Sequence, residues 1–177
     1  MGKVIVYIAS SLDGFIARPD DDITWLEPFS AGGDYGYGEF IRNVGTAVMG
    51  ARTNEQSLAH PERLITGLKN YILTSRSLPI ATGIDAELWN NPLPGLMKKI
   101  RQESEKDIFL VGGGQVISRF PDEGLVDEMN LFIVPVILRE GIPLFSGIRR
   151  EVTLRLDEAT PFSTGIVKLQ YIPVAQV

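Results

Sequence analysis

Two long runs of β-branched and apolar residues constrain the fold more than any other feature of this sequence. The runs KVIVYIAS (3–10) and DIFLVGG (107–113) contain almost no polar alternation. Strands of this kind are buried on both faces, as in a parallel sheet that is covered by helices. The sequence therefore predicts an α/β protein in which helices lie on both faces of one sheet.

Strand-like and helix-like segments alternate through the first two-thirds of the chain, and strand-like segments dominate the rest. Apolar residues at helical spacing predict helices at 37–45, 51–59, 93–106 and 114–120. Further apolar runs predict strands at 46–50, 70–76, 86–89 and 128–138, and an antiparallel hairpin at 153–172. Pro135 suggests an edge, a bend or a bulge in the strand that contains it. Without repeats, low-complexity tracts or linkers, residues 1–177 are expected to form a single domain.

Composition excludes several classes of function. The net charge of -5 disfavours a nucleic-acid-binding or anionic membrane-binding surface, which would need a basic patch. The apolar runs are far shorter than a membrane span of about 20 residues. The absence of cysteine excludes disulfides and fits a reducing cytoplasm, and the lone His60 disfavours a metal site.

Ligands of open α/β sheets bind at the carboxyl ends of the strands, so the residues that follow each strand are candidates. Gly112, Gly113 and Gly114 stand between a predicted strand and a predicted helix. Glycines at such a place either make a tight turn or allow an anion to approach the amides at a helix N-terminus. The standard dinucleotide motif GxGxxG is absent.

Two other strand ends carry groups that suit a phosphate. Arg52 and Thr53 follow Gly50 at the start of a predicted helix, and the segment 74–76 supplies two hydroxyls and a guanidinium. Either segment by itself is explained by surface capping. Their coincidence with three glycines at one edge of the sheet favours a phosphorylated ligand.

Five segments together resemble a known family. They are SLDGFIA (11–17), VMGARTNE (48–55), YILTSR (71–76), FLVGGGQVI (109–117) and NLFIVPVILREGIPLF (130–145). The sequence resembles the dihydrofolate reductase-like superfamily, most closely the reductase branch that includes the C-terminal domain of riboflavin-biosynthesis deaminase-reductases. The resemblance implies a three-layer α-β-α fold whose central sheet is mostly parallel, with an antiparallel C-terminal edge hairpin.

The resemblance also implies NADPH as the hydride donor and assigns residues to it. The nicotinamide would lie along Ala9, Ile16 and Ala17. The phosphates would lie beside Gly50, Arg52 and Thr53, and the adenosine ribose with its 2′-phosphate beside Thr74, Ser75 and Arg76. The pyrophosphate would lie on Val111, Gly112, Gly113, Gly114, Gln115 and Val116. Ala51 stands where the family commonly has arginine, so the preference for NADPH over NADH depends largely on Arg76.

Two carboxylates are candidate catalytic residues. Folate reductases pair a carboxylate before the second strand with a threonine on the sixth, and here the nearest carboxylate is Asp34, then Glu39. Phe132 occupies the place of the threonine, so this pair is not visible. Asp13 is shared with the riboflavin branch, and its alternative role is to form a turn before Gly14.

Three hypotheses follow from the resemblance. The first is a cytoplasmic NADPH-dependent reductase that acts on a pyrimidine- or pteridine-like small molecule, in the manner of 5-amino-6-(5-phosphoribosylamino)uracil reductase. The second is folate reduction of the dihydrofolate reductase type. The third is a catalytically silent nucleotide-binding homodimer, or a homo-oligomeric scaffold in which the glycines only make turns and the strand at 128–138 pairs or packs across a two-fold interface.

Overall fold

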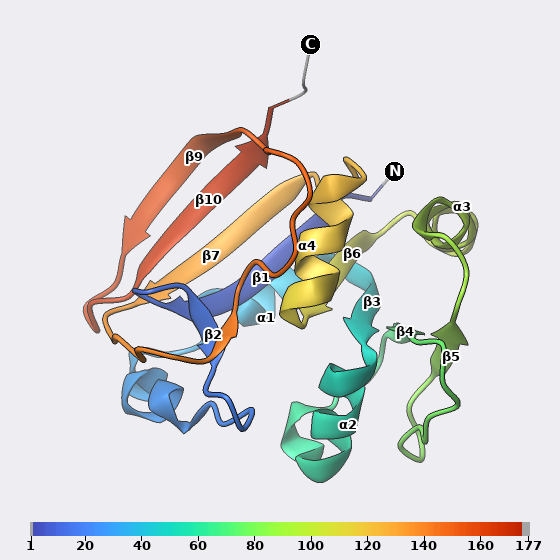
Figure 1. Cartoon of the computed structure of the whole chain (residues 1–177), viewed down its shortest axis with the longest axis horizontal. Helices are drawn as coiled ribbons and strands as arrows, with labels where there is room; N and C mark the ends of the chain where they lie inside the picture. The colour runs from blue at the N-terminus through green and yellow to red at the C-terminus, as the bar shows by residue number, and fades with distance from the viewer. Residues whose placement is uncertain (1, 175–177) are drawn as a thin grey trace.

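A computed structural model describes residues 2–174, and eight of its strands form one sheet (Figure 1). Their order across the sheet is β5-β4-β3-β6-β1-β7-β10-β9. The six strands from β5 to β7 are joined by five parallel pairings, and the C-terminal hairpin adds two antiparallel pairings at one edge. The strands are β1 (Val4–Ser11), β3 (Val44–Gly50), β4 (Lys69–Leu73), β5 (Ala86–Trp89), β6 (Asp107–Gly112), β7 (Glu128–Val134), β9 (Leu154–Pro161) and β10 (Val167–Pro173). Two short strands, β2 (Phe15–Ala17) and β8 (Ile142–Pro143), pair separately.

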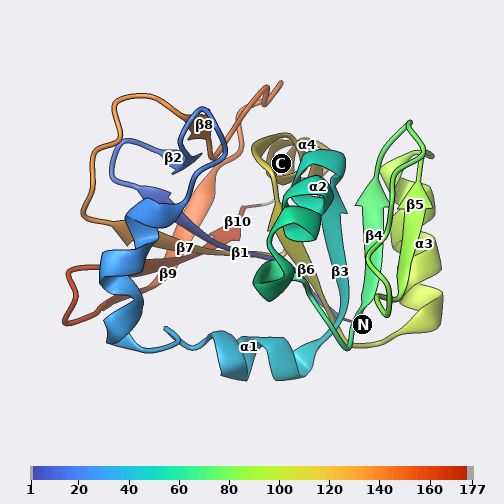
Figure 2. The ribbon, with the colours of Figure 1, turned by 90° about the horizontal axis from the view of Figure 1, so that it is seen from below.

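Helices cover both faces of the sheet, which confirms the predicted three layers (Figure 2). The helical segments are η1 (Thr24–Gly32), α1 (Tyr37–Asn43), α2 (Ala51–Ala59), η2 (Pro61–Arg63), α3 (Leu93–Glu103) and α4 (Gly114–Asp122). Apolar residues of α3 and α4 pack on one face of the sheet, in one cluster with Val4 and Val6 of β1. On the other face, Phe40 of α1 stacks on Tyr7 with ring centroids 4.6 Å apart. No helix within residues 2–174 has both the length and the apolar character needed to cross a membrane.

Several boundaries differ from the predictions for local reasons. The predicted strand at 128–138 ends at Val134, because Pro135 has no N–H to donate to a neighbouring strand. The predicted strand at 70–76 ends at Leu73, where the Oγ1 of Thr74 accepts a hydrogen bond from the amide of Arg76. The segment η1 lies in a region for which no element was predicted from the sequence.

The path of the chain creates a crevice beside β1. After β1 the chain builds β3, β4 and β5 outward, and then returns to place β6 between β3 and β1. It next places β7 on the other side of β1. Connections that leave neighbouring strands in opposite directions open a crevice at the carboxyl ends of those strands. Here the crevice lies where β3, β6 and β1 end.

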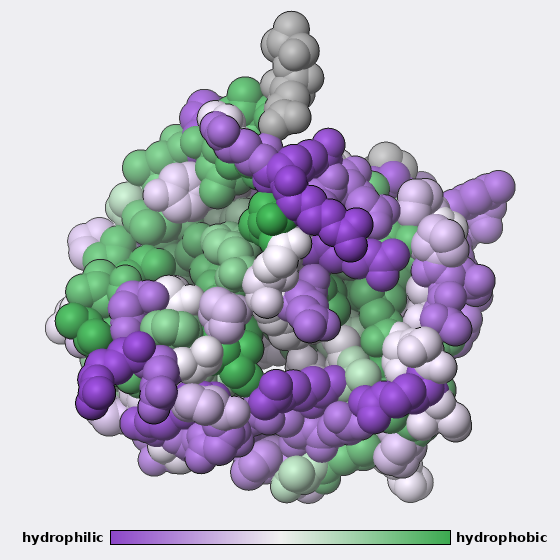
Figure 3. Space-filling model, viewed as in Figure 1, coloured by the Kyte–Doolittle hydropathy of each residue, from purple (hydrophilic) through white to green (hydrophobic). Residues whose placement is uncertain are grey.

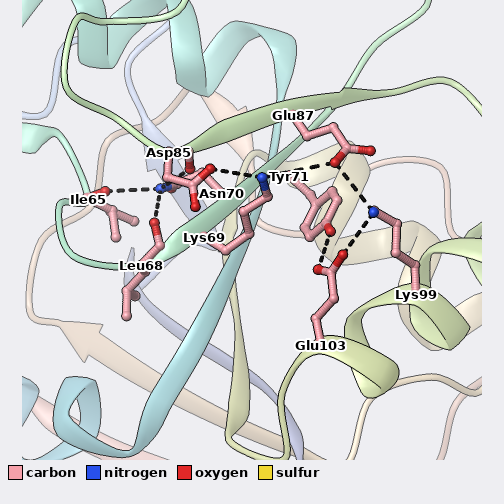
Figure 4. A network of polar contacts seen from close by, with 9 residues as sticks. All are labelled: Ile65, Leu68, Lys69, Asn70, Tyr71, Asp85, Glu87, Lys99 and Glu103. Carbon is pink, nitrogen blue, oxygen red and sulfur yellow. Dashed lines mark hydrogen bonds and ion pairs between the residues drawn. The ribbon is translucent and has the colours of Figure 1, made fainter.

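A polar network closes the edge of the sheet at β4 and β5 (Figure 4). Tyr71 is fully buried, and its hydroxyl donates to the carboxylate of Glu103 at 2.5 Å. Lys99 bridges Glu103 at 2.8 Å and Glu87 at 3.6 Å. Burial, and then the bond to Glu103, raise the pKa of Tyr71. The network therefore satisfies a buried hydroxyl and ties α3 to the sheet.

The Tyr71→Phe variant is expected to lose about 1 kcal/mol of unfolding free energy at pH 7, the usual net value of one hydrogen bond. The hydrogen bond from Lys99, and then that from Tyr71, lower the pKa of Glu103. The stabilisation is therefore present above the ordinary pKa of 4.5 and is lost as pH falls through the lower folded-state value. Urea unfolding at pH 7 and pH 3 should show the difference between the two proteins shrinking at pH 3. A difference that is equal at both pH values would contradict this account.

Candidate active site

A cavity of about 1180 Å³ lies at the carboxyl edge of the sheet. Five strand ends contribute to its wall, from Trp89 of β5 through Leu73 of β4, Gly50 of β3 and Gly112 of β6 to Ala9 of β1. The segment from Ile16 to Leu26 and the strand β8 contribute to the opposite wall. The cavity thus follows the crevice that the strand order creates.

The cofactor residues that the resemblance assigns are brought together on the wall of this one cavity. They are Ala9, Ile16, Ala17, Gly50, Arg52, Thr53, Thr74, Ser75, Arg76, Val111, Gly112, Gly113, Gly114, Gln115 and Val116. They come from five separate stretches of the chain, and it is the order of the strands that makes them neighbours.

The three consecutive glycines have different physical roles. Gly112 has φ of 136°, a conformation that side chains rarely adopt, and its peptide bond to Gly113 is cis. A Cβ on Gly114 would lie 2.4 Å from the carbonyl oxygen of Pro143, so the fold needs glycine there. A Cβ on Gly113 would meet nothing closer than the Oγ1 of Thr53 at 3.7 Å. The first and third glycines therefore serve the fold, whereas Gly113 borders open space.

Two helices begin at the cavity. α4 starts at Gly114 and α2 at Ala51, each directly after a strand end. The two starts lie close together, as shown by the distance of 3.2 Å between a Cβ placed on Gly50 and a methyl group of Val116. The first amides of a helix have no partner within the helix, and the helix dipole makes that end favourable for an anion. The middle of the cavity is therefore suited to a phosphate.

The two predicted arginines are both paired with carboxylates. Arg52 lies 2.7 Å from Asp21, and Arg76 lies 3.1 Å from Glu55. The pair of Arg52 joins the start of α2 to the loop that precedes η1. A third guanidinium on the wall, that of Arg119, lies 3.3 Å from Glu123.

Several wall residues were not predicted from the sequence. Asn90 and Asn91 follow β5, so the strand-end rule would have found them. Arg119 lies four residues after Gln115 and hence on the same face of α4. No sequence pattern identifies Asp21 and Leu26 as wall residues. Both belong to an irregular stretch of chain, and only its path in the fold brings them to the cavity.

The structure does not bring Asp13 or Asp34 to the cavity wall. Asp13 accepts hydrogen bonds from the amides of Leu138 and Arg139 and so joins the loops after β1 and β7. Asp34 accepts from the amides of Gly36 and Gly38 just before α1. These two bonds, that from Gly36 first, lower the pKa of Asp34, whereas a general acid needs a raised one.

Two aromatic residues near the cavity belong to the core. Trp25 and Phe132 are both buried and share one apolar cluster. Phe132 therefore offers no hydroxyl in place of the threonine used by folate reductases. No group of three or more His, Cys, Asp or Glu side chains within the described chain is arranged to hold a metal ion.

Together, the mostly parallel sheet and its carboxyl-edge cavity define a dihydrofolate reductase-like fold. Within it, the chain belongs to the RibD C-terminal domain family, whose sequence model matches residues 2–168. A similar protein is the uncharacterized YwjB of Bacillus subtilis (strain 168), which is 31% identical over 177 residues. That alignment covers 96% of this chain and 97% of YwjB.

Solved structures share the fold at lower sequence identity. A candidate riboflavin biosynthesis protein of Shewanella sp. PV-4 has a TM-score of 0.88 at 23% identity, over 98% of this chain and 99% of its own. The deaminase/5-amino-6-(5-phosphoribosylamino)uracil reductase of Thermotoga maritima has a TM-score of 0.72 at 18% identity, over 98% of this chain and 57% of its own. Dihydrofolate reductase of Enterococcus faecalis, complexed with NADP(H), has a TM-score of 0.67 at 16% identity, over 97% and 96%.

Proposed function

We propose that this protein is a cytoplasmic, single-domain reductase that transfers hydride from NADPH to a pyrimidine- or pteridine-like small molecule. The observation that carries the proposal is one cavity whose wall joins two helix N-termini, Gly113 and the end of β1. Family membership supports reductase chemistry, since a neighbour of this fold is a 5-amino-6-(5-phosphoribosylamino)uracil reductase. Another neighbour is complexed with NADP(H).

The layout of the cavity suits an extended dinucleotide. The strand ends of β4, β3, β6 and β1 are consecutive in the sheet, so the wall spans three strand spacings, or about 14 Å. We place the adenosine beside Thr74 and Arg76 of the β4 end and the pyrophosphate over Gly113. The nicotinamide then lies at β1, against Ala9.

The charged and apolar residues of the wall are distributed in agreement with this placement of the dinucleotide, from the β4 end to β1. The guanidinium groups of Arg52, Arg76 and Arg119 lie on the wall where phosphates would bind, each paired with a carboxylate. The end near β1 is lined instead by Ile16, Ala17 and Leu26, which would exclude water from a hydride donor. NADPH supplies the hydride chemistry, and the residues of the wall supply its binding and orientation.

The catalytic carboxylates of the sequence hypothesis have no proton-transfer role in this proposal. Asp13 and Asp34 are engaged by backbone amides outside the wall. Without an acid and a threonine at the places of the folate pair, folate reduction is the less supported alternative. The catalytically silent alternative predicts tight cofactor binding without turnover of any pyrimidine or pteridine.

Thermal unfolding with NADPH tests the binding step. Ligand at about a hundred times its dissociation constant adds roughly 2.7 kcal/mol, which for this length raises the midpoint by about 5–10 °C. The Gly113→Ala variant should unfold at the wild-type temperature, because its methyl group would make only an ordinary contact with Thr53 at 3.7 Å, and should lose most of the NADPH response. An unchanged NADPH response in Gly113→Ala would show that the pyrophosphate does not bind at this loop. A wild-type protein that responds to neither NADPH nor NADH would refute the proposed function.

We further propose that two copies pair through the apolar face of the C-terminal hairpin, and not through the strand expected at 128–138, because β7 is already paired with β1 and β10. Figure 3 shows an apolar surface over β9 and β10, on the face that α4 covers elsewhere. We name it the β9–β10 apolar patch, and it comprises Leu154, Leu156, Ala159, Val167, Leu169 and Tyr171. Charged residues such as Arg155 and Glu158 occupy the opposite face of the same strands. A symmetric interface places each patch against its own copy, so a patch without charge is self-complementary.

A further inference from the structure

We propose that Asp21 and Glu55 set the choice of this protein between phosphorylated and unphosphorylated nicotinamide dinucleotides. The inference depends on the proposed function, because it concerns the phosphate end of the same cavity. Each carboxylate holds one of the two arginines that a phosphate would otherwise engage. Discrimination would then result from competition for these arginines.

Asp21 is held in place by its own loop. The amide of Asp21 donates to the carbonyl of Arg18, and the amide of Arg18 donates to the carbonyl of Asp22. The side chains of Arg18 and Asp22 also pair with each other. Asp21 has φ of 69°, a conformation that aspartate and asparagine tolerate better than most residues. The loop thus presents this carboxylate to the cavity as a preformed turn.

Asp21 and Arg52 both lie on the wall of the cavity and meet across its mouth. The Arg52 guanidinium lies 2.7 Å from one carboxylate oxygen and donates to the other at 2.9 Å. A second, longer contact of 3.5 Å joins Arg52 to the carbonyl of Pro19. A phosphate that binds Arg52 must therefore displace Asp21 or bind beside its negative charge.

Glu55 makes the corresponding pair at the β4 end. It belongs to α2 and lies 3.1 Å from the guanidinium of Arg76, which stands on the cavity wall. The amide of Arg76 is held by Thr74, so the backbone of this residue is fixed while its side chain is 64% exposed. Such a side chain is free to exchange the carboxylate for a phosphate.

Each of the two carboxylates has opposite effects on the binding of NADH and of NADPH. A carboxylate near an adenosine ribose accepts a hydrogen bond from the 2′-hydroxyl of NADH and repels the 2′-phosphate of NADPH. Its pairing with arginine also lowers the positive charge that the phosphate would meet. Exposed pairs of this kind are weak, so we expect three- to tenfold changes in the affinity ratio for each substitution. Glu55 should have the larger effect, because its partner Arg76 stands at the β4 end of the cavity, where we place the adenosine.

Titration of purified full-length protein with NADPH and NADH tests the inference. Asp21→Asn and Glu55→Gln keep the shape of each side chain and remove its charge. Each variant should raise the affinity ratio of NADPH to NADH by three- to tenfold, and the double variant should raise it further. Asp157→Asn is the matched control, because Asp157 pairs with Arg155 at 2.9 Å on β9. Its ratio should equal that of the wild type.

The possible outcomes distinguish a failure of this inference from a failure of the proposed function. A wild type that binds a dinucleotide, together with an unchanged ratio in both variants, would overturn this inference and leave the proposed function intact. A lower affinity for NADPH in Asp21→Asn would also overturn it, since Asp21 would then hold Arg52 in place for the phosphate. If the wild type and all variants bind neither dinucleotide, the proposed function and this inference are overturned together.

Discussion

The Gly114→Ala variant is expected to unfold about 2–12 °C below the wild type. Its Cβ would lie 2.4 Å from the carbonyl oxygen of Pro143, which is a backbone atom and cannot rotate away. Relieving an overlap of this kind costs about 1–3 kcal/mol. For a chain of this length, each 1 kcal/mol lowers the thermal midpoint by about 2–4 °C. Calorimetric unfolding of the variant and the wild type measures the difference.

The expected loss opposes the normal effect of this substitution. Within a helix, replacing glycine by alanine usually stabilises by about 1 kcal/mol. Because Pro143 lies in β8, which pairs with Phe15 and Ala17 of β2, its displacement should also disturb the cavity wall and weaken cofactor binding. Gly113→Ala, one residue earlier, should keep its stability and lose only binding. Equal midpoints in the Gly114→Ala and wild-type proteins would show that β8 is not held against α4.

The Leu156→Asp variant is expected to be a folded monomer at concentrations where the wild type is a dimer. Leu156 is 48% exposed on the β9–β10 apolar patch, so a charge there is solvated in the monomer. In a symmetric interface, the same charge would be buried twice, close to its own copy. Burying like charges in this way should weaken dimerisation by at least a hundredfold, which corresponds to about 3 kcal/mol. Sedimentation equilibrium and light scattering distinguish the two states.

A charge on the other face of the same strand provides the control. Arg155 precedes Leu156 and points away from the patch, so Arg155→Asp should leave the association unchanged. Circular dichroism should show that both variants remain folded. A monomeric wild type at micromolar concentration would refute the proposed homodimer, and dissociation by both variants would place the interface at the edge of β9 instead.

Local patterns were sufficient to predict most of the sheet. The uninterrupted apolar runs at β1 and β6 predicted strands that are buried on both faces. Both strands lie in the centre of the sheet. The segment AELW was predicted as a strand over 86–89, and β5 has these bounds. The predicted hairpin forms the antiparallel edge. The proline at 135, whose effect was left open, ends β7 instead of bending it.

Long-range contacts could not be predicted in the same way. Arg52 and Asp21 are 31 residues apart in the chain, and no periodicity records that they meet. The irregular segment η1 mixes aromatic residues with Pro28 and Gly32, so neither a helical nor a strand period describes it. The structural role of Asp34 depends on two backbone amides, those of Gly36 and Gly38. These amides can donate to Asp34 only after the turn at the start of α1 has formed, so the sequence pattern does not reveal them.

The central place of β6 in the sheet has a consequence for how the protein is protected in solution. The strand that carries the glycines is inserted between β3 and β1, which were built earlier in the chain. The cavity therefore does not exist in any partly folded form that lacks this strand. A ligand of the cavity would bind only forms in which β6 is in place, so its binding free energy would stabilise the parallel part of the sheet and not one loop alone. Cellular ligand concentration would then govern the resistance of that part of the sheet to proteolysis.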